Sequence, residues 1–238
     1  MENLRPGGFR ITDRAVELAR FQRKDRILDI GCGQGDTVAR LCREFDMEAE
    51  GIDLNLARID QARKAHPNIQ VKFGDGEFLD DYSSFTFDGV FMECALSMIN
   101  IPDEALHEAY CVLKKGGRLV ISDLYEKAPD LKKLEAVRIE AERQRKLPHK
   151  EGDCGEDPVR FVDFRLDGVF FKKPLLTQLK EIGYEIVAFE DRSADLDDYV
   201  AQTLLEEGSL ENLCTCVDLS DRSRRLGYFL LVARKPEK

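Results

Sequence analysis

The sequence predicts an α/β fold in which helices cover both faces of a doubly wound, mostly parallel sheet of seven strands. Two observations predict it. Short apolar runs alternate with amphipathic stretches through the first half of the chain, which gives five strands. Two more apolar runs, at 184–189 and 226–233, follow in the second half. Strands that alternate with helices imply right-handed crossovers and a parallel sheet.

The elements of the first half follow from apolar periodicity and from capping residues. Val38 and Leu41 begin a series of apolar residues at helical spacing. Asn55 can cap the next helix, and Gly116-Gly117 is expected to turn the chain before the fifth strand. The predicted order is strand 27–30, helix 36–44, strand 49–53, helix 55–66, strand 69–73, strand 87–94, helix 103–113 and strand 118–122.

The second half is less regular, and we interpret it as part of one domain spanning residues 1–238. Its predicted elements are helices at 130–146, 175–182 and 197–207, a short strand at 169–171, and the strands at 184–189 and 226–233. We expect the core to comprise residues 20–123 and 174–238, with an insertion or lid at 124–173 and a helical insertion at 190–225.

Composition and charge argue against several classes of function. The 238 residues carry 36 Lys and Arg against 46 Asp and Glu, a formal net charge of −10 at pH 7. This charge disfavours nonspecific binding to nucleic acid or to a membrane surface. No apolar run approaches the roughly 18 residues of a membrane span. We therefore expect no nucleic-acid or membrane partner, and a monomer or homodimer.

The cysteines predict the compartment and argue against a metal. There are seven, an odd number, and the chain does not begin with an apolar signal segment. Both features indicate reduced thiols in a cytoplasmic protein. No Cys or His cluster has the spacing of a zinc site. The sequence therefore predicts no structural metal.

The most informative segment is the glycine-rich turn that leaves the first strand. Gly31, Gly33 and Gly35 alternate with other residues, beginning with Cys32, so a ligand can lie against bare backbone at the start of a helix. The spacing G-x-G-x-G differs from a dinucleotide fingerprint, and no Lys-Ser/Thr pair follows as in a phosphate-binding loop. Asp29, two residues earlier, would repel a pyrophosphate but suits a cation such as an ammonium group.

Further acidic residues follow the ends of the next strands. Asp53, followed by Leu54, ends the second strand, where a carboxylate accepts hydrogen bonds from ribose hydroxyls. Asp75 can accept from an adenine amino group, while Gly76 lets its N–H approach the ring. Glu93 ends the fourth strand. Because ligands of open α/β sheets bind outside the carboxyl ends of the strands, these residues predict one ligand with an ammonium group, a ribose and an adenine.

At these motifs the chain resembles the class I S-adenosylmethionine-dependent methyltransferases. The resemblance covers about residues 26–123 and rests on D-I-G-C-G-Q-G, I-D-L at 52–54, G-D-G at 74–76 and V-L-K-K-G-G-R-L-V at 112–120. It implies a Rossmann-like fold whose last two strands form an antiparallel hairpin. The overall look is nearest the quinone-biosynthesis and arsenite-type subgroups. The segment 5–8 and the insertions look like substrate-lid regions.

The resemblance also implies a role for each matching residue. S-adenosylmethionine is the expected cofactor. Asp29 and the loop glycines should hold its methionine part, Asp53 its ribose, and Asp75 and Gly76 its adenine. The full set of expected cofactor-binding residues is Asp29, Gly31, Cys32, Gly33, Gly35, Asp53, Leu54, Asp75, Gly76 and Glu93.

The first functional hypothesis is methyl transfer to a small-molecule acceptor, by in-line displacement at the sulfonium methyl. Because the cofactor is already activated, the protein mainly supplies alignment and a dry site. A base is needed only if the acceptor carries a proton. Glu93, Tyr125 and His149 are the candidates. The acceptor atom stays open between C, N, O and S.

Two alternatives stay open. The segment 92–97 partly resembles arsenite methyltransferases, with Glu93 in place of their Asn, so Cys94 and Cys154 could bind a metalloid together with Cys214 or Cys216. The other interpretation of Cys94 is a small buried apolar residue. The second alternative is a cofactor-binding module without catalysis. A nucleic-acid methyltransferase is disfavoured by the negative charge and by the lack of an N/D-P-P-Y/F/W segment after the fourth strand.

Overall fold

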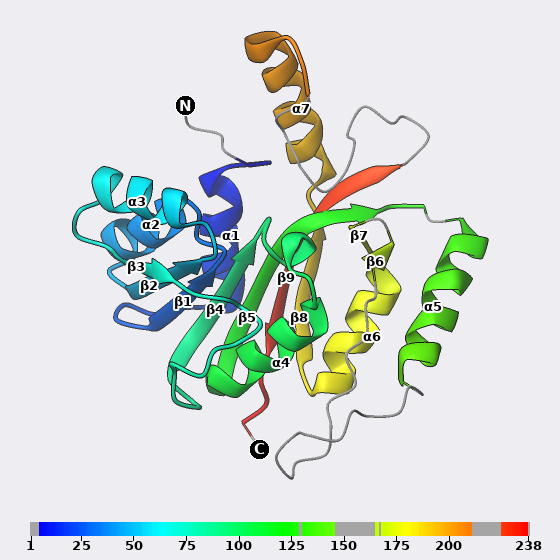
Figure 1. The fold of residues 1–238 in the computed structure, drawn as a ribbon, viewed down its shortest axis with the longest axis horizontal. Coiled ribbons are helices and arrows are strands. Elements are labelled where there is room, and N and C mark those ends of the chain that lie inside the picture. The colour runs from blue at the N-terminus through cyan, green and yellow to red at the C-terminus, as the bar shows by residue number, and fades with distance from the viewer. Residues whose placement is uncertain (1–4, 129, 146–164, 167, 211–224, 238) are drawn as a thin grey trace.

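The computed structural model describes residues 5–128, 130–145, 165–166, 168–210 and 225–237. These residues form a mixed α/β structure in which helices flank a single sheet (Figure 1). His149, Cys154, Cys214 and Cys216 lie outside the described residues. None of the helices within these ranges is both long and apolar enough to cross a membrane.

The main sheet has the spatial order β3-β2-β1-β4-β5-β9-β8. The strands are β1 (Arg26–Ile30), β2 (Glu48–Asp53), β3 (Gln70–Phe73), β4 (Phe87–Glu93), β5 (Leu113–Glu126), β8 (Glu185–Asp191) and β9 (Leu226–Arg234). β1 to β5 are parallel, whereas β9 runs antiparallel between β5 and β8. The predicted fold class is therefore confirmed, including the antiparallel pair at the C-terminal end.

Helices cover both faces of this sheet. The helices of the described residues are α1 (Phe9–Ala19), α2 (Asp36–Glu44), α3 (Leu56–Ala65), η1 (Leu96–Met98), α4 (Pro102–Val112), α5 (Leu131–Arg145), α6 (Lys172–Ile182) and α7 (Ser193–Glu207). One core cluster joins α4 and α6 to the sheet, and a second joins α1, α2 and α3 to the other face. Apolar strand residues therefore meet apolar helix faces on both sides, as in other parallel sheets.

Helix α1 was not predicted. Ile11, Ala15 and Ala19 recur at helical spacing, and all three are buried in the second core cluster. The core was expected to begin at residue 20, whereas α1 contributes Ile11, Ala15 and Ala19 to the second core cluster. The apolar positions of α1 alternate with charged residues, and that pattern is the signal that the sequence offered.

The fifth strand is longer than predicted. β5 begins at Leu113 and continues through Gly116-Gly117, where a turn was expected. The N–H of Gly116 donates to the carbonyl of Lys235 at 2.9 Å, so the chain beyond β9 pairs with this stretch. At its other end, β5 pairs with the short strand β7 (Val169–Phe171), and β7 in turn pairs with β6 (Arg165–Leu166). β5 therefore extends beyond β4, with which it pairs as far as Ser122.

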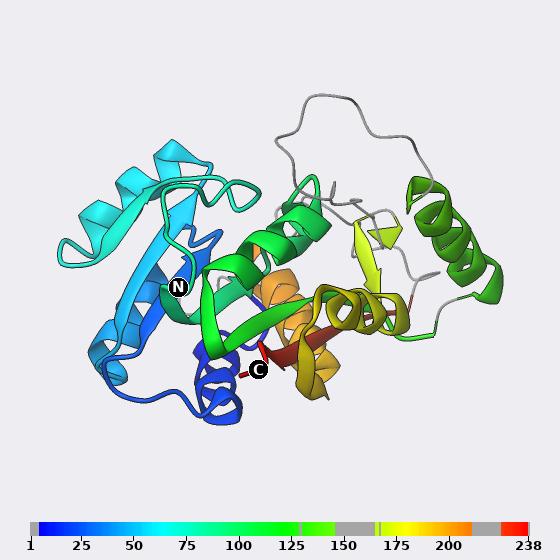
Figure 2. The ribbon, with the colours of Figure 1, turned by 90° about the horizontal axis from the view of Figure 1, so that it is seen from below.

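The two ends of the sheet are covered differently. α5, β6 and β7 lie at the end of the molecule opposite α3 (Figures 1 and 2). α7 stands beyond the carboxyl edge of the parallel strands (Figure 1). An ion pair between Arg10 and Asp195, at 3.0 Å, joins α7 to α1. This ion pair thus connects α1, from the first half of the sequence, to α7, from the second half.

Candidate active site

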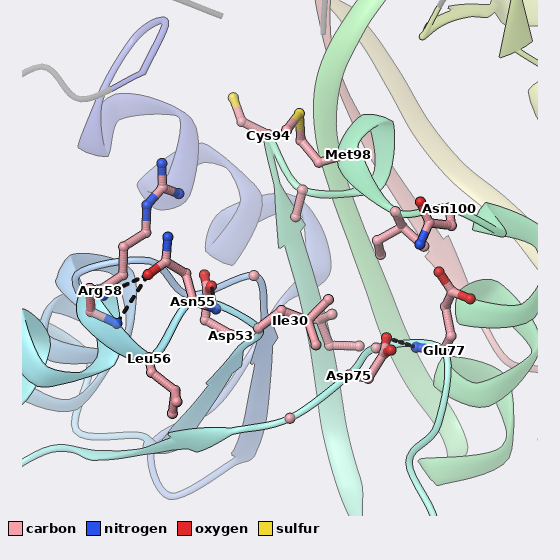
Figure 3. A pocket seen from close by; sticks show the side chains of 17 residues that line it. Ile30, Asp53, Asn55, Leu56, Arg58, Asp75, Glu77, Cys94, Met98 and Asn100 are labelled. Carbon is pink, nitrogen blue, oxygen red and sulfur yellow. Dashed lines mark hydrogen bonds between the residues drawn. The ribbon is translucent and has the colours of Figure 1, made fainter. Parts of the chain in front are cut away.

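A cavity of about 640 Å³ opens at the carboxyl ends of β1, β2, β3 and β4 (Figure 3). The predicted site residues that line it are Gly31, Asp53, Leu54, Asp75, Gly76 and Cys94. The other lining residues include Asn55, Arg58, Glu77, Met98 and Asn100. Strand ends that are far apart in the sequence therefore meet around one space, as the sheet topology predicts.

The glycine-rich loop brings bare backbone to this cavity. Gly31 has a φ of +76°, and a Cβ there would lie 2.6 Å from the Cβ of Ala95, so only glycine fits. Gly33 has a φ of +54°, and nothing lies within 4 Å of the place its Cβ would take. The N–H groups of Gly31 and Cys32 donate to the carbonyl of Ile52 and tie the loop to β2. The loop is thus fixed, and it presents Gly31 to the cavity, whereas Gly33 borders open space outside the cavity lining.

Asp53 is held by the backbone on both oxygens. Its Oδ2 accepts from the N–H of Gly33 at 2.8 Å, and its Oδ1 accepts from the N–H of Asn55 at 2.7 Å. A carboxylate offers about four acceptor positions, so roughly two remain for a ligand. Asn55 in turn caps α3, as predicted. This arrangement suits a pair of neighbouring hydroxyl groups.

Asp75 lies across the cavity from Asn55 (Figure 3). Its Oδ1 accepts from the N–H of Glu77 at 2.9 Å, which fixes the turn after β3. A Cβ on Gly76 would lie 2.5 Å from Ile30, so this glycine lets the turn pack against the end of β1. Leu54 exposes more than half of its side chain at the rim. The site therefore combines a carboxylate with an apolar wall, which suits an adenine ring.

Asp29 is buried beside the cavity and does not line it. Its residue is 2% exposed, and none of the hydrogen bonds among the described residues involves its carboxylate. Burial raises the pKa of Asp29 well above its usual range, and the nearby Glu93 carboxylate raises it further, while Arg5 opposes the shift. A buried carboxylate without a hydrogen bond is unfavourable. Its chemistry fits a cationic group brought by a ligand, such as an ammonium.

Glu93 does not line the cavity either. Its carboxylate forms an ion pair with Arg5 at 2.8 Å and accepts hydrogen bonds from Thr12 at 3.1 and 3.2 Å and from Thr37 at 2.8 Å. Arg5 also donates to both threonine hydroxyls. The structure thus places Glu93 in a buried network with the N-terminal segment, α1 and α2. This arrangement does not favour Glu93 as a ligand of the cofactor or as a base.

The other predicted residues lie in the surroundings. Cys32 is buried behind the glycine loop, where burial raises the pKa of its thiol. Gly35 is the N-cap residue of α2 and packs against Ile69. Tyr125 packs edge-on against Phe189 and Phe229 and does not line the cavity. Within the described residues no group of His, Cys, Asp or Glu is arranged to hold a metal ion.

Cys94 lines the cavity, but its environment keeps it protonated. Its Sγ lies 3.0 Å from the hydroxyl oxygen of Tyr228, which in turn donates to Ser122 at 2.9 Å. Burial, helped by the charge of Asp123, raises the pKa of the Cys94 thiol to about 12. A metal-binding or nucleophilic cysteine needs the thiolate. The structure therefore gives no support to the arsenite-type hypothesis.

We expect Cys94 to resist alkylation at neutral pH. Iodoacetamide reacts with thiolates, and a thiol with a pKa near 12 is almost entirely protonated at pH 7.5. Cys111 is exposed and serves as the internal reference. Peptide mass spectrometry after limited alkylation should show modified Cys111 and unmodified Cys94. Equal rates at the two cysteines would contradict this account of the thiol.

Comparison with known proteins agrees with this geometry. A family model described as a methyltransferase domain matches residues 21–158. The 27-O-demethylrifamycin SV methyltransferase of Amycolatopsis mediterranei is 28% identical over a 248-residue alignment, which covers 96% of this chain and 84% of the relative. The O-methyltransferase cnsE of Penicillium expansum is 24% identical, with 89% of this chain and 72% of the relative covered.

Solved structures share the fold. The [4+2]-cyclase SpnF superposes with a TM-score of 0.68 at 22% identity, covering 97% of this chain and 82% of that protein. Phosphoethanolamine N-methyltransferase 2 of Haemonchus contortus, solved with S-adenosylmethionine, also gives 0.68, at 16% identity and with 99% and 54% covered. The predicted family and cofactor are thereby confirmed. The chain belongs to the methyltransferase domain family and is a class I S-adenosylmethionine-dependent methyltransferase.

Proposed function

We propose that this methyltransferase acts on a hydroxyl oxygen of a small organic acceptor. The observation that carries the proposal is the likeness, over 96% of this chain, to a relative named for O-methylation of a rifamycin. A second relative, matched over 89% of this chain, is also named an O-methyltransferase. Matches of this length extend beyond the family domain at 21–158, so they include the second half of the chain.

We further propose how the cavity holds the cofactor. The buried Asp29 carboxylate accepts the ammonium group, because it has no hydrogen bond to any described residue and carboxylates outnumber cations around it there. The remaining acceptor positions of Asp53 take the two ribose hydroxyls. Asp75 and the backbone at Gly76 take the adenine, with Leu54 at its face. The roles of Asp53, Leu54, Asp75 and Gly76 are supported by their place in the cavity lining, and the role of Asp29 by its burial beside the cavity.

When bound, S-adenosylmethionine would supply an activated methyl group: the acceptor oxygen would bond to the methyl carbon while the carbon–sulfur bond breaks and S-adenosylhomocysteine leaves. The protein aligns the two partners and excludes water. Cys94 and Met98 lie together at one end of the cavity (Figure 3) and give that end an apolar, polarisable lining. Since Glu93 and Tyr125 do not line the cavity, we propose His149, in the basic segment after α5, as the base that takes the hydroxyl proton.

A methyl-transfer screen tests this function. Purified protein and methyl-labelled S-adenosylmethionine are incubated with phenols, hydroquinones and macrocyclic alcohols, each paired with its amine, its thiol and its O-methyl ether. We expect label on free hydroxyl compounds and none on the corresponding ethers. Transfer confined to amines, thiols or carbon would contradict O-methylation. The matched control is Asp53→Ala, which should abolish transfer to every acceptor because the ribose contacts are lost.

A further inference from the structure

One wall of the cavity is a short connection that contains the single-turn helix η1. We call residues 94–100, between β4 and α4, the wall loop; Cys94, Ala95, Met98, Ile99 and Asn100 from it line the cavity. The Met98 side chain is 53% exposed and reaches the cavity surface. The backbone groups that such a connection leaves unpaired need partners from elsewhere in the structure. What holds the wall loop therefore decides the shape of the cavity.

The first partner is the carboxylate of Asp123, near the end of β5. Asp123 is 1% exposed and follows Ser122, the last residue of β5 that pairs with β4. Its Oδ2 accepts from the N–H of Ser97 at 2.8 Å, and its Oδ1 accepts from the N–H of Leu124 at 2.8 Å. Asp123 does not line the cavity, so it acts on the site through the wall loop, by its hydrogen bond to Ser97 and its charge near the Cys94 thiol.

The second partner is Arg165, on the short strand β6. Its Nη1 donates to the carbonyl of Ser97 at 2.6 Å, and its Nη2 donates to the carbonyl of Asn100 at 3.1 Å. The N–H and the C=O of Ser97 are thus both held by charged side chains. β6 pairs with β7, and β7 pairs with Tyr125 and Glu126, just beyond Asp123 on the same strand. Asp123 and Arg165 therefore belong to one hydrogen-bonded unit.

Burying the Asp123 carboxylate costs free energy, so we infer for it a role other than stabilising the fold. Burial raises the pKa of Asp123 to about 6, although the hydrogen bonds from Ser97 and Leu124 and the charge of Arg165 oppose the rise. The titratable or charged groups that face it are the Cys94 thiol, on the wall loop, and the Arg165 guanidinium, on β6. At neutral pH neither of these two changes its charge.

We propose that Asp123 and Arg165 are positioning residues that grip the Ser97 peptide and hold the wall loop against the bound cofactor. Arg165 thereby links β6, and through it β7, to the cofactor cavity. A displacement of β6 moves the carbonyls of Ser97 and Asn100, and with them Met98 in the cavity wall. This inference rests on the proposed role of the cavity as the cofactor site.

Calorimetric titration with S-adenosylhomocysteine tests the positioning role of Asp123 and Arg165 and requires no methyl acceptor. Asp123→Asn places an amide NH₂ opposite the Ser97 N–H, and Arg165→Met removes both donors to the wall loop. We expect each variant to bind about tenfold more weakly, and the double variant to bind little worse than either, because the two act on one peptide. The control is Arg138→Met, on α5, whose guanidinium pairs, among the described residues, with Glu135 and Glu142 of its own helix. Its affinity should equal that of the parent.

The pH dependence separates positioning from general destabilisation. Between pH 7.5 and 5 the affinity of the parent should fall as Asp123 becomes protonated, and in Asp123→Asn that part of the fall should be absent. Unchanged affinity in Arg165→Met, or identical pH profiles for parent and Asp123→Asn, would overturn the proposal. A parent that binds no S-adenosylhomocysteine would instead overturn the cavity assignment, so the two failures are distinguishable. If Asp123→Asn does not fold, Arg165→Met carries the test alone.

Discussion

Replacing Asp29 with Asn should weaken the binding of S-adenosylmethionine by about 100-fold and also raise the melting temperature of the ligand-free protein. The loss of affinity follows because the variant cannot offer a negative charge to the ammonium group. Removing one member of a buried charge pair costs roughly 2–5 kcal/mol, and about 2.7 kcal/mol corresponds to 100-fold. Calorimetric titration with S-adenosylhomocysteine measures the change.

The gain in stability follows from the pKa of Asp29. Its folded-state pKa lies well above the usual value of 3.8. At pH values between the two, the folded protein holds a proton that the unfolded chain has released. The stability that Asp29 contributes is therefore full at low pH and is lost as the pH rises through the folded-state pKa. Asn carries no charge, so the variant avoids this loss at pH 7.5. Scanning calorimetry of the ligand-free proteins measures it.

A matched control separates this effect from a general change in charge. Asp36→Asn alters the same residue type at the end of the same loop, where Asp36 contacts His66 at 2.9 Å outside the cavity. Its affinity for S-adenosylhomocysteine should stay within a few-fold of the parent. An Asp29→Asn protein that binds as tightly as the parent, or that melts at a lower temperature, would refute the role assigned to this carboxylate.

Replacing Arg5 with Met should lower the free energy of unfolding by roughly 3–5 kcal/mol, because it removes one partner of a buried ion pair. The Glu93 carboxylate would keep its two threonine donors but lose its only cation among the described residues, with Asp29 close by. For a chain of this size the melting temperature should fall by roughly 10 °C. Chemical denaturation and scanning calorimetry measure both quantities.

A second substitution checks the cause. Adding Glu93→Gln to Arg5→Met should restore part of the stability at pH 7.5. The control is Arg10→Met: its guanidinium, 69% exposed, pairs with Asp195 near the surface and should contribute less than about 1 kcal/mol. Similar losses for Arg5→Met and Arg10→Met would rule out the buried network as the cause.

The parts of the site that the sequence predicts are those fixed by sheet topology. Asp53 and Asp75 each end or follow a parallel strand, and the carboxyl ends of parallel strands share one edge of the sheet. The glycines between Gly31 and Gly35 mark a place where backbone replaces side chains. Each signal lies within one short stretch of sequence, so it can be recognised without knowing how the rest of the chain folds. The structure brings these segments together at the carboxyl edge of the sheet.

The residues that the sequence did not reveal act across long separations. Glu93 ends a strand as Asp53 does, but its side chain points to the face covered by α1 and α2, where it meets Thr12 and Thr37. Successive strand residues point to opposite faces of the sheet. A shift of one position along the strand therefore decides whether a side chain reaches the cavity or the buried network. Its partner Arg5 stands in a segment whose spacing carries no sign of the pairing.

Asp123 was missed for a related reason. It stands within an apolar run at the end of β5, where the pattern indicates a buried strand and nothing more. Its partner Arg165 belongs to a two-residue strand that no periodicity could predict. A charged residue inside a buried strand is itself a signal, because burial of a lone carboxylate is unfavourable. That signal identifies Asp123 as a residue of interest, but only the fold shows that it holds Ser97.

The central claim is that carboxylates at successive strand ends hold one S-adenosylmethionine molecule in a single orientation. A crystal structure of the complex with S-adenosylhomocysteine tests it most directly. The account predicts the amino group beside Asp29, both ribose hydroxyls on Asp53 and the adenine amino group on Asp75, with the sulfur directed toward Cys94. A nucleoside bound away from these residues, or in the reverse orientation with its adenine beside Asp29, would contradict it.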